Sequence, residues 1–137
     1  FNLWAGAGFT AGGMAFGADA EYLARHDMGF AGFIRYYQPG DLGNVGGTVF
    51  GGLWRAHFPY KTWDFYASPG FGFAMLSKAN GKIKNSTFTP IFSVGVMYAF
   101  SPTMSLGVEN LKVLSFTTDN FRGIVIDDFM LKLRLSM

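Results

Sequence analysis

Residues 129–137 read Phe-Met-Leu-Lys-Leu-Arg-Leu-Ser-Met, and their side chains alternate in character along the chain. One face of an extended strand would carry Phe129, Leu131, Leu133, Leu135 and Met137, and the other Lys132, Arg134 and Ser136. A period of two residues is typical of a β-strand that has one apolar and one polar face. About nine to eleven residues of tilted strand cross a bilayer. The stretch therefore predicts a strand of a membrane-spanning barrel.

The same alternation recurs along the whole chain. The predicted strands are residues 1–10, 17–25, 30–37, 48–58, 64–75, 88–100, 105–115 and 125–137. The seventh is the weakest, because Asn110 and Lys112 interrupt its apolar face. An even number of antiparallel strands closes without a free edge. We predict an all-β fold, an eight-stranded antiparallel up-and-down transmembrane β-barrel, with residues 1–137 as its single domain.

The composition favours this fold over the alternatives. Hydrophobic residues make up 50% of the chain and charged residues 15%, against about 25% charged in soluble domains. Two long stretches without charge, 1–18 and 85–108, contain helix-breaking glycines or prolines and alternate with period two, which argues against membrane helices. The net charge is only +2 and is scattered, so we expect no nucleic-acid partner. There is no cysteine.

Asn80-Gly81 predicts the register of the central hairpin, because this dipeptide is the strongest signal for a two-residue hairpin turn. Pairing outward from it sets Phe73 opposite Phe88, Phe71 opposite Pro90 and Tyr66 opposite Gly95. A slip of one residue would invert every side chain.

Most strand charges fall on the face opposite the apolar one. This set consists of Asp19, Glu21, Arg25, Arg35, Arg55, Asp64, Glu109, Asp128, Lys132 and Arg134. It holds five acidic and five basic side chains. The interior of an eight-stranded barrel is just wide enough for side chains to fill it, and charges there must pair. We therefore predict a lumen charge network that plugs the barrel. The alternative is a soluble ligand-binding barrel, with its charges in water and its apolar face inside.

The connections predict the orientation. The short ones, at 26–29, 59–62 and 101–103, would be periplasmic turns flanked by aromatic residues. The longer ones, around 12–16, 38–46, 77–87 and 117–123, would be extracellular.

The pattern resembles the small eight-stranded outer-membrane barrels of Gram-negative bacteria, such as the OmpA transmembrane domain, OmpX and OmpW. The resemblance covers the whole chain and includes residues 129–137, which look like the assembly signal of such proteins, although the last residue is Met137 where the family has an aromatic one. It implies a bacterial outer-membrane location, with membrane lipid as a partner.

Some barrels of this kind modify lipids, so an outer-membrane hydrolase or acyltransferase is the enzymatic alternative. That chemistry needs a serine nucleophile beside a histidine base. The two histidines, His26 and His57, fall at predicted periplasmic turns without a serine two residues away. We therefore predict no enzyme, no cofactor and no metal site. The letters of residues 6–11 match a dinucleotide fingerprint, but no buried strand of full length precedes them and no helix follows.

The predicted lipid face has one region of small residues, formed by Ala5, Ala7, Ala18, Ala20, Ala24 and Gly32. Small residues allow close approach of protein surfaces in membranes, so we expect a homo-oligomer interface there. The alternative is a merely thin lipid-facing patch. Three lysines, Lys78, Lys82 and Lys84, surround the predicted hairpin turn and would either contact lipopolysaccharide or decorate a solvated tip.

The predicted function is that of a structural or porin-like barrel whose homo-oligomers organise or enclose lipid. A monomeric surface barrel that acts in adhesion, or in the passage of small hydrophobic molecules, is the further alternative.

Overall fold

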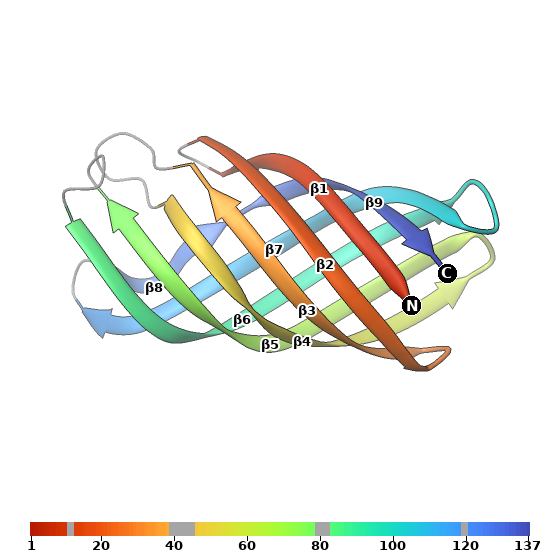
Figure 1. Ribbon diagram of the computed structural model, residues 1–137, viewed down its shortest axis with the longest axis horizontal. Coiled ribbons are helices and arrows are strands. Elements are labelled where there is room, and N and C mark those ends of the chain that lie inside the picture. The colour runs from red at the N-terminus through yellow and green to blue at the C-terminus, as the bar shows by residue number, and fades with distance from the viewer. Residues whose placement is uncertain (11–12, 39–45, 79–82, 119–120) are drawn as a thin grey trace.

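The computed structural model describes residues 1–10, 13–38, 46–78, 83–118 and 121–137 (Figure 1). The strands of this part are β1 Asn2–Thr10, β2 Gly13–Arg25, β3 Met28–Tyr37, β4 Gly46–Tyr60, β5 Trp63–Lys78, β6 Ile83–Ala99, β7 Met104–Thr118, β8 Phe121–Asp127 and β9 Phe129–Ser136. Only Asp128 separates β8 from β9, and both pair with β7, so together they form one strand of the wall. The described residues include no helix long and apolar enough to cross a membrane.

The strands close into a barrel. Each strand from β1 to β7 pairs antiparallel with the next, β7 also pairs with β9, and β1 pairs with β9 from Asn2 opposite Ser136 to Phe9 opposite Phe129. The result is the predicted eight-stranded up-and-down barrel. Figure 1 shows the strands crossing the long axis obliquely, with both termini at the same end. We call this end the terminal end.

The predicted register of the central hairpin is confirmed. Phe73 pairs with Phe88, Phe71 with Pro90 and Tyr66 with Gly95, as expected from Asn80-Gly81. The turn dipeptide itself lies outside the described residues.

Several strands are longer than predicted at the end opposite the termini. β2 begins at Gly13 instead of Gly17, and β5 and β6 continue to Lys78 and from Ile83, through a region expected to be loop. A hairpin ladder continues as long as the two backbones stay paired. Outside a bilayer its side chains no longer need to alternate, so the sequence pattern ends before the strand does.

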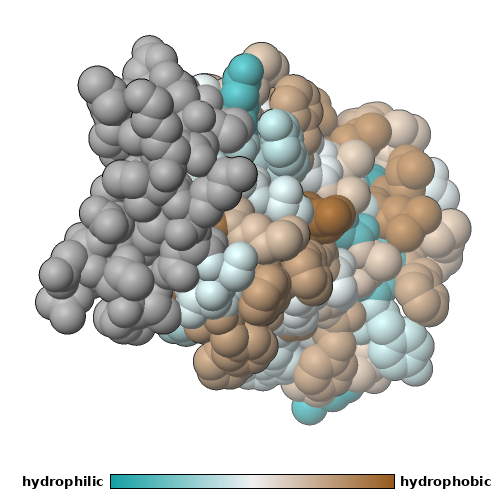
Figure 2. All heavy atoms as spheres, turned by 60° about the vertical axis from the view of Figure 1, so that its left-hand side comes forward, coloured by the Kyte–Doolittle hydropathy of each residue, from teal (hydrophilic) through white to brown (hydrophobic). Residues whose placement is uncertain are grey.

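The two faces of the wall differ sharply in character. Large apolar side chains point outward, so that Phe71 is 60% exposed while the inward Trp4 is 2% exposed. Figure 2 shows hydrophobic residues over most of the visible outer wall, with smaller hydrophilic areas between them. The inner face instead carries buried charged side chains such as Arg35, Arg55 and Lys132. This arrangement contradicts the soluble barrel, which would have apolar residues inside, and it suits a wall covered by lipid.

Candidate functional site

The centre of the lumen is an ion network built around two carboxylates. Asp19 on β2 accepts hydrogen bonds from Arg35, from Arg55 at 2.9 Å and from Lys132 at 2.7 Å. Glu109 on β7 accepts from Arg35 at 3.0 Å and from Lys132 at 3.2 Å. All five side chains are fully buried and come from five different wall strands. Each buried charge therefore has an opposite charge within hydrogen-bond distance, as burial requires.

Aromatic rings line this network. The guanidinium of Arg55 lies 4.4 Å from the ring centroid of Trp4, and the Lys132 ammonium lies 4.9 Å from it. The hydroxyl of Tyr66 donates to Glu109 at 2.7 Å. Cation–π contacts of this kind stabilise cations that have lost water. No role in the lumen was predicted from the sequence for Trp4 or Tyr66.

Inward glycines make room for the long side chains. A Cβ added to Gly17 would lie 2.5 Å from Cδ of Arg35, and one added to Gly95 would lie 2.4 Å from the Tyr66 ring. Real Cβ atoms essentially never come this close to another heavy atom. Large charged and aromatic side chains of the lumen therefore lie over glycines of the neighbouring, hydrogen-bonded strand.

A second cluster lies towards the terminal end. His57 Nε2 is 2.6 Å from Glu21 Oε2, and His57 Nδ1 is 2.8 Å from Asp64 Oδ2. Arg134 donates to Asp64 at 2.5 Å and to Ser105 at 3.0 Å. A ring that donates to a carboxylate from each nitrogen carries two protons, and is a cation. In this geometry His57 adds a positive charge that the sequence analysis did not assign.

The structure corrects the predicted network at one residue. Arg25 does not enter the lumen: its side chain is 65% exposed and pairs with Asp27 at 3.3 Å. The physical reason is a shift of register between Leu23 and Arg25, which breaks the alternation at the end of β2. His57 replaces Arg25 as the fifth basic side chain of the lumen. With its imidazole protonated, the lumen holds five carboxylates and five cations.

The remaining predicted lumen residue, Asp128, lies apart from both clusters. It accepts from the Tyr37 hydroxyl at 2.7 Å and from the Leu111 backbone N–H at 2.9 Å. Both of these partners, Tyr37 and Leu111, belong to a buried hydrophobic cluster on the inner face. The buried hydrophobic cluster there consists of Ala15, Ala31, Phe33, Tyr37, Val49, Leu53, Ala74, Leu76, Ile91, Leu111, Val113, Ile126 and Met130. An apolar layer and an ionic layer thus both fill the described lumen.

The small-residue region lies on the outside. Ala5, Ala7, Ala18, Ala20, Ala24 and Gly32 are all exposed. Ala5 pairs with Ala18, and Ala20 pairs with Gly32, so most of the set is contiguous across β1 to β3. Gly52 on β4 pairs with Gly32 and extends the row, which the sequence analysis missed.

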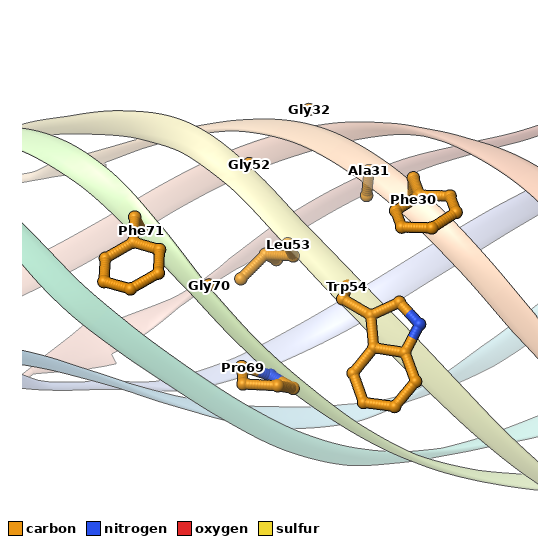
Figure 3. Close-up of a pocket in the computed structure, with 9 residues that line it drawn as sticks. All are labelled: Phe30, Ala31, Gly32, Gly52, Leu53, Trp54, Pro69, Gly70 and Phe71. Atoms are coloured by element: carbon orange, nitrogen blue, oxygen red, sulfur yellow. The ribbon is translucent and has the colours of Figure 1, made fainter.

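The row ends in a groove of about 520 Å³ on the outer wall (Figure 3). Gly32 and Gly52 form its floor, where an added Cβ would have no heavy-atom neighbour closer than 3.9 Å. The rings of Phe30, Trp54 and Phe71 project beside it in Figure 3. The groove is a concave apolar surface on the lipid-facing side of the wall.

Both nitrogens of His57 face carboxylates, and His26 is exposed. Within the described part of the chain, no serine hydroxyl forms a hydrogen bond with either ring. The described residues also contain no cluster of three or more His, Asp or Glu side chains that could hold a metal ion. Lys82 and the side chains of Lys78 and Lys84 lie outside the described part of the structure, so their predicted lipopolysaccharide contact stays a prediction.

A closed eight-stranded antiparallel barrel with a charged interior and a large apolar outer wall defines the class of small outer-membrane β-barrels. Solved structures of this class resemble the chain over nearly its whole length. The N-terminal β-barrel domain of Pseudomonas aeruginosa OprF is 14% identical with a TM-score of 0.69, covering 97% of this chain and 92% of that one. Neisserial surface protein A (NspA) is 14% identical with a TM-score of 0.70, covering 99% of this chain and 95% of that one.

The outer membrane enzyme PagL is similar too, at 15% identity and a TM-score of 0.62, with both chains covered in full. Identities this low show the fold. No protein-family model matches the chain, and no curated protein matches it either.

Proposed function

We propose that this protein is a non-enzymatic outer-membrane barrel that acts through its outer surface, with a lumen that stays closed. The observation behind the proposal is the buried network of Asp19, Glu109, Arg35, Arg55 and Lys132, which joins side chains across the barrel interior. A path for ions would need these pairs to separate. Separating a buried pair leaves uncompensated charges in a medium of low dielectric constant, which is costly.

The occupied nitrogens of His57 support the non-enzymatic part of the proposal. An acyl-transferring serine needs an imidazole nitrogen free to accept its proton, whereas Glu21 and Asp64 bracket this ring.

Conductance tests the closed lumen. The purified monomer is expected to give no stepwise current in a planar lipid bilayer, because buried ion pairs join side chains across the barrel interior. A porin reconstituted in the same bilayers provides the positive control. Regular single-channel steps from the monomer, at a frequency that scales with protein concentration, would overturn the closed-lumen proposal.

A barrel with a closed lumen can still act through contacts made by its outer surface. We propose that the row from Ala5 to Gly52 and the adjoining groove form a homo-oligomer interface that organises or encloses lipid. Transmembrane helices associate by close packing of small residues, and the same physical reason applies to a row of small residues on a barrel wall. Exposed rings such as Phe71, which pairs with Gly52, border the row, so that one copy has both a concave and a protruding surface to offer another.

Native mass spectrometry of the detergent-extracted protein tests this interface. The wild type is expected to give a defined multimer with bound lipid, and the Ala7→Leu/Ala20→Leu variant a monomer, because leucines would hold the walls apart. Val94→Leu, an outward substitution on β6, is the matched control and should leave the multimer intact. A wild-type monomer, or a multimer unchanged by the two leucines, would contradict the proposal.

A further inference from the structure

His57 joins strands across the mouth of the lumen at the terminal end. Nε2 of its ring, on β4, lies 2.6 Å from Oε2 of Glu21 on β2, and Nδ1 lies 2.8 Å from Oδ2 of Asp64 on β5. Arg134, on β9, donates to the same oxygen of Asp64. The middle member of this side-chain tie is therefore the residue type whose charge changes most readily near neutral pH.

One side of this tie is open to water. His57, Asp64 and Arg134 line a pocket of about 230 Å³ together with Met137 at the terminal end. The side chains of Asp64 and Arg134 are 14% and 11% exposed, whereas that of Glu21 is fully buried. Water from the terminal end therefore reaches the Asp64 side of the ring but not the Glu21 side.

The charges around the ring balance only when it is protonated. The titratable and charged side chains packed near it are Glu21 on β2, Asp64 and Tyr66 on β5, Arg134 on β9, Arg55 on β4, and His26 and Asp27 in the turn between β2 and β3. Tyr66 and Arg55 belong to the central network, and Asp27 pairs with Arg25. The imidazolium and Arg134 thus offset Glu21 and Asp64, and a neutral ring would leave one negative charge uncompensated.

A neutral imidazole has one N–H and one lone pair, so it can donate to only one of the two carboxylates. Oε2 of Glu21 accepts from no other side chain of the described residues, since Asn2 and Trp4 donate to Oε1. Oδ2 of Asp64 also accepts from Arg134 and borders the pocket. A buried acceptor that loses its donor costs more than one that water can reach. The neutral ring therefore keeps its N–H on Nε2, towards Glu21, and presents a lone pair on Nδ1 to Asp64.

We infer that His57 is a pH-sensitive latch on the mouth of the lumen at the terminal end. As an imidazolium it ties Asp64 on β5 to Glu21 on β2. When Nδ1 loses its proton, the ring keeps its hydrogen bond to Glu21 and releases Asp64, which turns to the water of the pocket. The latch is closed at low pH and open at high pH. The inference goes beyond the proposed function and does not need the protein to self-associate.

Nitrogen NMR of the wild-type protein in detergent micelles tests the latch directly, with histidine labelled by nitrogen-15 and the pH raised from 5 to 10. The His57 ring is expected to be doubly protonated at the start and to lose the proton on Nδ1, so that the Nε2–H tautomer remains. The carboxyl carbon resonance of Asp64 should change at the same pH. A ring that stays doubly protonated throughout, or that loses the proton on Nε2 instead, would overturn the inference, and this measurement requires no variant.

Urea-induced unfolding in lipid vesicles gives a second test. The unfolding midpoint of the wild type is expected to fall between pH 6 and pH 10, because the tie across the mouth is lost when the ring becomes neutral. His57→Gln should show a smaller fall, whereas His26→Gln, a change at the exposed histidine of the same end, should keep the wild-type fall. Thermal unfolding checks that each variant is folded. Equal falls in the wild type and a folded His57→Gln variant would also overturn the inference.

Discussion

Replacement of Asp19 by alanine is expected to lower the free energy of unfolding by about 3–5 kcal/mol, which is the usual cost of removing one partner from a buried ion pair. Asp19 accepts from Arg35, Arg55 and Lys132 at once, and all four side chains are fully buried. Without it, three cations would share Glu109. Urea-induced unfolding of the protein in lipid vesicles measures the change.

The same substitution, aspartate to asparagine, can be compared at a buried and at a half-exposed position. Asp19→Asn removes a buried charge, whereas Asp127→Asn removes one that is half-exposed and pairs with Lys112. The first should destabilise the barrel by several kcal/mol, and the second by less than about 1 kcal/mol, because exposed pairs contribute little. Similar losses for the two variants would show that the central network does not hold the lumen together.

A valine at Gly17 is expected to destabilise the barrel by about 1–3 kcal/mol, the usual cost of overpacking a filled interior. Gly17 pairs with Arg35, and an added Cβ would lie 2.5 Å from Cδ of that side chain. Arg35 would have to leave its position between Asp19 and Glu109. Chemical unfolding and the rate of refolding into vesicles measure the loss.

Gly32→Val is the matched control on the outer face. The nearest atom to a Cβ at Gly32 is the carbonyl oxygen of Gly51 at 4.0 Å, so the fold has room for it. We expect a stability within about 0.5 kcal/mol of the wild type, as for most surface substitutions. The added side chain would fill part of the groove in Figure 3, and it should weaken self-association without unfolding the monomer. Equal destabilisation by the two valines would contradict the assignment of the two faces.

Much of the fold could be predicted because the alternation of side chains every two residues is a property of each strand by itself. Residues 129–137 show by themselves which side chains share a face, and the pairs predicted from Asn80-Gly81 are present in the barrel. The same rule failed at Arg25, since a shift of register in β2 breaks the alternation there. Periodicity cannot reveal such a shift, because it depends on how two backbones pair.

The partners within the site could not be predicted in the same way. The sequence placed His57 only near a predicted turn, because its position between Glu21 and Asp64 depends on strands β2 and β5 meeting β4 inside a closed barrel. Asp127 likewise became the partner of Lys112 only through the pairing of β8 with β7.

The sequence by itself determined the two faces of each strand, the barrel they build and the presence of buried charges, because alternation follows from the geometry of a single extended chain. Only the tertiary structure decided which charges pair. Arg35 meets Glu109 across 74 residues of chain, and Lys132 meets Asp19 across 113. Such contacts depend on the stagger of the strands around the closed barrel, which sets the height at which each side chain enters the lumen.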